Sequence, residues 1–151
     1  MKFKGDIIIT DPCYIIRDEN QMTKDDWEEC NYGENMEALG IKNYLTRGTI
    51  YGDWSCTTYN KDTGEEIGKF GADAGLVSVF LLSEVLAYNP DFDYHISKPW
   101  TTTLIKDFDG NIEIKVVNIA NEYTSIIDGG KKEVRVIGEG NINFFTTQTG
   151  F

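Results

Sequence analysis

Alternating apolar and polar residues in the last third of the chain constrain its fold more than any other feature. Thr101–Lys106 and Ile112–Val117 carry this alternation on either side of Asp109-Gly110, a dipeptide typical of tight β-hairpin turns. Tyr123–Ile127 and Glu133–Ile137 repeat the arrangement around a glycine-rich turn. Because side chains alternate between the two faces of a strand, the pattern predicts two antiparallel hairpins in this region.

Several shorter runs predict further strands. They share a β-branched, aromatic or continuously apolar composition, and turn-forming residues separate them. Gly138–Asn141 is predicted to bend the chain into the last of them. In chain order these runs are Gly5–Thr10, Thr49–Tyr51, Trp54–Tyr59, Glu65–Phe70, Leu76–Leu81 and Ile142–Thr147.

Short helices are predicted between these strands. Thr23 is a candidate N-cap for the first, because acidic residues follow it in the first turn. Gly40 is a candidate left-handed stop for a second helix, Glu34–Leu39. Ser83 is a candidate N-cap for a third, Glu84–Tyr88, which an Asn-Pro dipeptide ends.

Together these segments predict a single domain that spans residues 1–151. Its expected class is mainly β (α+β). The expected architecture is an antiparallel sandwich or a partly closed barrel of about nine or ten strands, with two or three short helices.

The amino-acid composition narrows the classes of molecule that we expect this chain to bind. The chain has 25 Asp and Glu residues against 14 Lys and Arg residues, a formal charge of −11. A field of this sign repels nucleic acid and anionic membrane surfaces, so neither is expected as a direct partner, and it favours a basic protein partner. No apolar run approaches the ~18 residues of a membrane helix, and the one near Met1 is too short for a signal peptide. We therefore expect a cytoplasmic protein. Its three cysteines are widely spaced and form no Cys-x-x-Cys pair, so we expect them to be reduced thiols.

The most distinctive segment is the end of the first predicted strand. Asp11, Cys13 and Tyr14 place a carboxylate, a thiol and a phenol at a corner that Pro12 stiffens. Rigid edges of this kind often carry binding sites. The structural alternative makes Asp11 a turn-forming residue and Cys13 a small buried hydrophobe.

Three further residues are candidates for the same site. Asp53 and Trp54 follow a glycine, and Asp73 lies among small residues, so that a ligand could approach the backbone closely. If these residues converge with Asp11, they form an acidic pocket for a cation or a polar small ligand, with Tyr14 and Trp54 as stacking faces. The alternative is that they are bulge and turn residues that specify the fold.

No complete catalytic set is recognisable, so no catalytic residue, metal site or cofactor is predicted. A nucleophilic Cys13 would need a nearby base or cation, and nothing in the sequence places the single histidine, His95, beside it. Asp91, Asp93 and His95 would share one face of an extended segment and could bind a metal, although such triplets are usually solvated. A cysteine- or metal-dependent hydrolase is therefore the third-ranked class.

The order of three segments resembles a loose group of small bacterial and phage proteins of uncharacterised function. The segments are Gly5–Tyr14, which ends in Asp-Pro-Cys-Tyr, then Tyr51–Trp54, then Ala72–Gly75. This chain has Trp54 where the group often has glycine and Ala74 where it often has serine. The resemblance covers the first half of the chain and implies that the three segments belong together.

The resemblance also implies a mobile-element origin, and it favours an inhibitor of a host defence or nucleic-acid-handling protein. The leading expectation is therefore a non-enzymatic, acidic binding protein that engages a basic protein partner. The alternative is a protein that binds or sequesters a small ligand, such as a nucleotide, at Asp11, Cys13, Tyr14, Asp53, Trp54 and Asp73.

Overall fold

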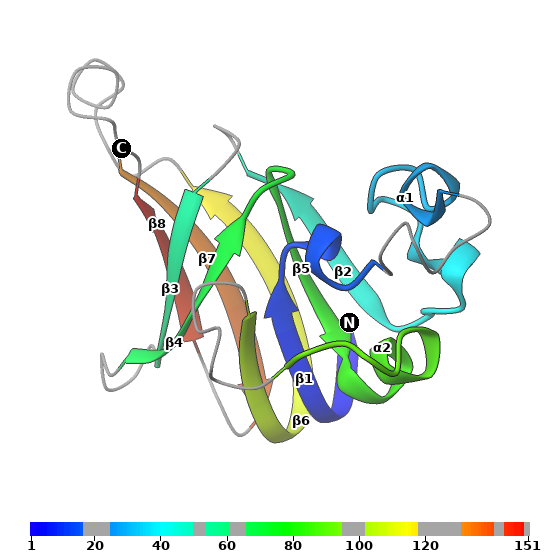
Figure 1. Ribbon diagram of the computed structural model, residues 1–151. Helices are drawn as coiled ribbons and strands as arrows, with labels where there is room; N and C mark the ends of the chain where they lie inside the picture. Colours follow the sequence, from blue (N-terminus) through cyan, green and yellow to red (C-terminus); the bar gives the residue numbers. More distant parts are fainter. Residues whose placement is uncertain are drawn as a thin grey trace.

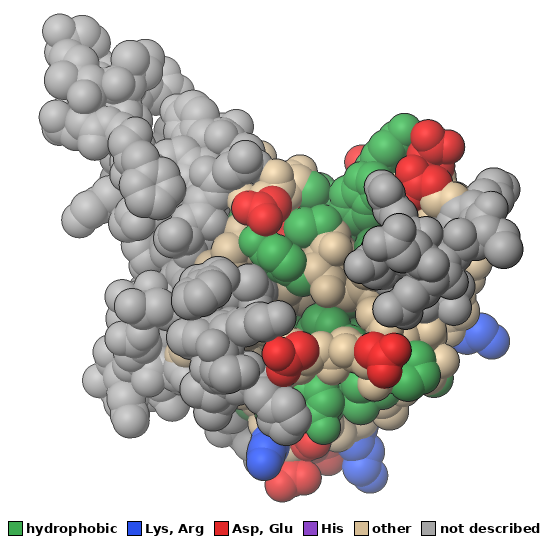
Figure 2. Space-filling view, in the orientation of Figure 1, with side chains coloured by type: hydrophobic (Ala, Val, Ile, Leu, Met, Phe, Trp, Pro, Cys, Tyr) green, Lys and Arg blue, Asp and Glu red, His purple; other side chains and the backbone are tan. Residues whose placement is uncertain are grey.

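A computed structural model describes residues 1–16, 25–49, 54–60, 66–94, 102–117, 131–140 and 144–149. The chain is mainly β, with the short helices gathered beside β1, β2 and β5 (Figure 1). In the same view, acidic and hydrophobic side chains are interspersed over the visible described surface (Figure 2). Among the described residues, no helix is long and apolar enough to cross a membrane.

One antiparallel sheet contains all the described strands, in the order β2-β5-β1-β6-β7-β8-β3-β4. Its two edge strands, β2 and β4, are not hydrogen-bonded to each other, so the described part of the chain forms an open sheet and no barrel. The strands are β1 (Lys2–Thr10), β2 (Tyr44–Gly48), β3 (Trp54–Asn60), β4 (Glu66–Ala72), β5 (Leu76–Leu81), β6 (Thr102–Val117), β7 (Lys131–Gly140) and β8 (Phe144–Thr149).

The helices are as short as predicted, but their caps differ. Helix α1 (Asp26–Glu29) is capped by Asp25, whose carboxylate accepts the Trp27 N–H; Thr23 lies outside the described residues. Helix α2 (Leu82–Tyr88) follows β5 directly, so Leu81 occupies the cap position and the predicted cap at Ser83 is wrong. The other helices among the described residues are 3-10 turns: η1 (Pro12–Tyr14) and η3 (Met36–Leu39), which ends at left-handed Gly40 as predicted.

The predicted turn at Asp109-Gly110 is wrong, because β6 is one continuous strand through both residues. The irregularity in this part of the sheet lies earlier, at a β-bulge where Gly5 and Asp107 both have positive φ and the β1–β6 register shifts. The Asp107 N–H donates to the Asp6 carboxylate at 3.0 Å, which stabilises this bulge. Long-range pairing with β1 and β7 therefore overrides the local turn preference.

The boundaries of several other elements also differ between the prediction and the structure. The predicted bend at Gly138–Asn141 is wrong at its start, since β7 continues to Gly140. Thr49 lies outside β2, although its N–H donates to the Gly75 carbonyl. The first strand of the second predicted hairpin lies outside the described residues, and so does its turn apart from Lys131, which begins β7. Strand β2 itself, Tyr44–Gly48, was not predicted.

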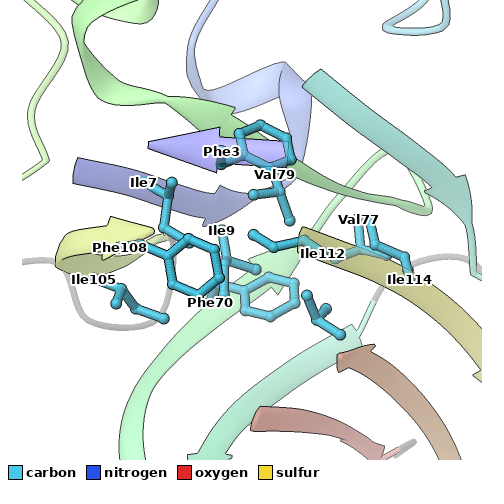
Figure 3. Close-up of a cluster of buried hydrophobic side chains, with 11 residues drawn as sticks. Phe3, Ile7, Ile9, Phe70, Val77, Val79, Ile105, Phe108, Ile112 and Ile114 are labelled. Atoms are coloured by element: carbon cyan, nitrogen blue, oxygen red, sulfur yellow. The ribbon is translucent and has the colours of Figure 1, made fainter. Parts of the chain in front are cut away.

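Two hydrophobic clusters pack against the sheet, one on each face. Ile7 and Ile9 face the larger cluster, shown in Figure 3, while Ile8 faces the cluster beneath the helices. Burial on both faces explains why the Ile7–Ile9 part of β1 is continuously apolar. Phe70 brings β4 into the larger cluster, and a Cβ built at Gly68 would lie 2.9 Å from the Thr103 hydroxyl oxygen. The sheet is therefore curved enough for β4 to pack against β6.

Candidate functional site

The corner after β1 is the 3-10 turn η1. Asp11 caps this turn, because its Oδ1 accepts the Cys13 N–H at 3.0 Å and its carbonyl accepts the Tyr14 N–H at 3.1 Å. Pro12 occupies the first position of the turn, where φ is already suitable and no N–H is needed. The strand end is therefore rigid and holds Cys13 and Tyr14 in defined positions.

The second Asp11 oxygen joins this corner to the turn between β4 and β5. Oδ2 accepts the Ala74 N–H at 2.8 Å and the Leu76 N–H at 3.4 Å. The side chain is fully buried. Burial raises the pKa of the Asp11 carboxyl, and the backbone N–H donors partly offset that rise. Asp11 thus connects two segments that are about sixty residues apart, and its oxygens are taken up by backbone groups.

Tyr14 and Asp73 meet at the surface of this junction. The Tyr14 hydroxyl donates a 2.6 Å hydrogen bond to Asp73 Oδ2. Burial is the main cause of the raised pKa of Tyr14. The hydrogen bond to Asp73 and the negative charge of Asp73 raise this pKa further. The exposed Asp73 carboxylate and the half-buried Tyr14 phenol form a pair that could bond to a polar or cationic group.

Gly33 packs against the other side of the corner. Its φ is +94°, and a Cβ built there would lie 2.7 Å from Pro12 Cγ and 3.1 Å from Leu76 Cδ1. Only glycine fits this conformation and this spacing without displacement. The sequence offered no direct signal for this contact, because Gly33 follows α1 and is remote in sequence from both partners.

The environment of Cys13 disfavours a thiolate. Burial raises the pKa of the thiol well above its usual range, and the adjacent Asp11 and Asp73 carboxylates raise it further. A nucleophilic cysteine needs the opposite environment, with a cation or base beside it. Cys13 therefore has the properties of an inert, half-buried thiol.

We expect Cys13 to be alkylated by iodoacetamide at pH 8 at least about tenfold more slowly in the folded protein than in the urea-unfolded chain. The raised pKa leaves little thiolate at that pH. Mass spectrometry of the digested protein would give the rate at this residue separately from the other two cysteines. Equal rates in the two states would contradict the assignment and restore Cys13 as a candidate nucleophile.

Comparison with protein-family models, with curated proteins and with solved structures finds no match to this chain.

The remaining two predicted ligand-binding residues are placed only in part. Asp53 lies outside the described residues. Trp54 begins β3, and its Cα pairs with that of Ala72, the residue before Asp73. Its backbone therefore lies beside the strand end that leads into the junction, although its side chain lies outside what the structure describes. Ligand binding by the six residues remains a prediction.

The candidate metal triplet is also incomplete, because His95 lies outside the described residues. Within the described ranges, no group of three or more His, Cys, Asp or Glu side chains is placed to hold a metal ion.

Proposed function

We propose that this chain is a non-enzymatic binding protein that engages a basic protein partner through acidic and aromatic side chains. The resemblance of its first half to small phage and bacterial proteins favours an inhibitor of a host defence or nucleic-acid-handling protein as the form of this activity. The observation that supports this proposal most directly is the formal charge of −11, together with the exposure of one acidic segment, residues 25–40.

The acidic segment has no Lys or Arg. Its exposed carboxylates flank Tyr32, which is 54% exposed and packs edge-on against Trp27 with ring centroids 6.0 Å apart. Exposed tyrosines surrounded by charges are typical of protein interfaces. The exposed acidic residues of the segment are Asp25, Glu28, Glu29, Glu34 and Glu37.

The fold is consistent with this proposal, because the exposed residues of the acidic segment lie on the side of the molecule that carries α1 (Figure 1). We infer that the packing of β4 against β6 makes the architecture sandwich-like, with the acidic segment outside it. Figure 2 shows acidic side chains across the visible face and basic ones toward its lower and right margins. Such a distribution favours a cationic partner over an anionic one.

The test is capture of a partner from a cell lysate, its identification, and a salt titration with the purified pair. We expect the dissociation constant to rise with ionic strength. Glu28→Gln/Glu29→Gln should raise it by about three- to tenfold, since exposed pairs contribute about 1 kcal/mol or less each. Asp91→Asn/Asp109→Asn removes the same charge from exposed positions elsewhere and is the matched control. Binding that is indifferent to salt, or equally affected by both double variants, would overturn the proposal.

A second candidate function is small-ligand binding at the η1 corner. The Tyr14–Asp73 pair supports it, because a buried carboxylate fixes both segments that present this pair. Thermal-shift screening with nucleotides, sugars and divalent ions should then show stabilisation that Tyr14→Phe reduces. The hydrolase alternative has less support, because the raised pKa of Cys13 disfavours its thiolate.

A further inference from the structure

We infer that Arg47 protects the outer edge of β2 and prevents a second copy of this chain from adding a strand to the sheet. Strand β2 lies at one end of the strand order, and among the described strands it pairs only with β5 (Figure 1). An unpaired edge offers backbone N–H and C=O groups to another extended chain. This inference concerns self-association and does not depend on the acidic segment or on a basic partner.

One hydrogen bond at the end of β2 shows which of its backbone groups point to the outer edge. The Thr49 N–H donates to the Gly75 carbonyl at 2.6 Å, in register with the β2–β5 pairs, so the backbone of Thr49 faces β5. In an antiparallel pair, residues that face the neighbouring strand alternate with residues that face away from it. The backbone groups of Gly48, Thr46 and Tyr44 therefore point to the outer edge.

The Arg47 side chain covers the middle of this edge. Its guanidinium donates from Nη1 to the Thr46 carbonyl at 2.8 Å, and thus occupies an acceptor that an added strand would need. Arg47 is exposed, whereas the three residues before it in β2 are half-buried. Charged side chains on short edge strands are a common protection against edge-to-edge association.

A second copy of the chain is the strand against which this protection acts, because β2 is complementary to itself. Antiparallel pairing centred on Thr46 places Tyr44 opposite Gly48, so each outward-facing residue lies opposite another one. Leu45 then lies opposite Arg47, and the two Arg47 side chains are diagonal neighbours on one face, about 7–8 Å apart. Like charges repel at that separation. Arg47 therefore opposes the pairing through its hydrogen bond and through its charge.

The test is sedimentation velocity of the intact chain and its variants in about 0.15 M salt, which screens the net charge of −11 beyond about 8 Å. We expect the unmodified chain and Arg47→Lys, which keeps the charge, to be monomers. At about 100 µM protein, Arg47→Val should reach a weight-average mass about 1.5 times that of one chain, as for a dissociation constant near that concentration. Asn111→Val adds the same side chain at an exposed position that is paired on both sides, and should stay monomeric.

A second-site variant tests whether the contact uses this edge. Gly48→Pro removes an outward N–H, which an edge strand tolerates, and no atom lies within 4 Å of a Cβ built there. Arg47→Val/Gly48→Pro should therefore be a monomer again. An unmodified chain that already associates, an Arg47→Val chain that stays monomeric, a double variant that still associates, or equal association of Asn111→Val would each overturn the inference. Thermal melting establishes that each variant folds, and Arg47→Thr replaces Arg47→Val if that variant does not.

Discussion

Asp11→Ala is expected to lower the free energy of unfolding by about 3 kcal/mol, because three backbone N–H groups lose a buried acceptor. A loss of this size corresponds to a fall of about 10 °C in melting temperature for a chain of this length. Differential scanning calorimetry or urea titration would measure it. Asp11→Asn keeps one acceptor oxygen and should lose less.

Asp73→Ala is the matched control for this experiment. It removes the same charge from the same junction, but its carboxylate is exposed and is bonded to the Tyr14 hydroxyl. The loss should therefore be small, since exposed polar contacts contribute little. If the two variants lost the same stability, Asp11 would not be the connection between η1 and the β4–β5 turn.

Gly33→Ala is expected to destabilise the protein by about 2–4 kcal/mol. The new methyl group would meet Pro12 at 2.7 Å, in a backbone conformation with φ of +94° that alanine adopts poorly. Chemical denaturation of the variant would measure this loss.

Gly40→Ala separates the two contributions to the Gly33 effect. Its φ is +83°, but no atom lies within 4 Å of a Cβ built there. It should therefore show only the backbone strain, about 1 kcal/mol. Equal losses at the two glycines would mean that contact with Pro12 contributes nothing, and that the loop of residues 30–35 does not support the η1 corner.

The sequence predicted best those elements whose burial is unambiguous. Leu76–Leu81 was predicted with both its ends, because a strand buried on both faces is mostly apolar, here apart from Ser78, and can be recognised without knowledge of its partners. Gly40 was predicted as a helix stop, because a left-handed cap is a local property. The mainly β class follows from the same local patterns.

Elements that depend on distant partners were missed or misplaced. Asp109-Gly110 has the composition of a turn, yet β1 and β7 pair on either side of it and keep β6 extended. Strand β2 is a short edge strand with intermediate or exposed residues throughout, so it has no strong apolar pattern. Without β2, the strand that covers the outer edge of β5 could not be anticipated.

The sequence identified the segments that form the candidate site, but it did not predict how their side chains and backbone groups contact one another. Asp11 was recognised as a residue of a stiff corner, and the turn-forming alternative described its hydrogen bond to Cys13 correctly. Its bonds to Ala74 and Leu76 depend on where β5 pairs with β1, which the local sequence does not encode.

The order of strands in the sheet also decides when each can form during synthesis. The Ile7-Ile8-Ile9 run of β1 is synthesised well before its two neighbours, because β5 and β6 begin only at Leu76 and Thr102. Pairing across such separations is slow, and an uncovered apolar strand associates readily with other chains. We therefore expect β1 to be prone to aggregation in the nascent chain until translation has passed the middle of β6.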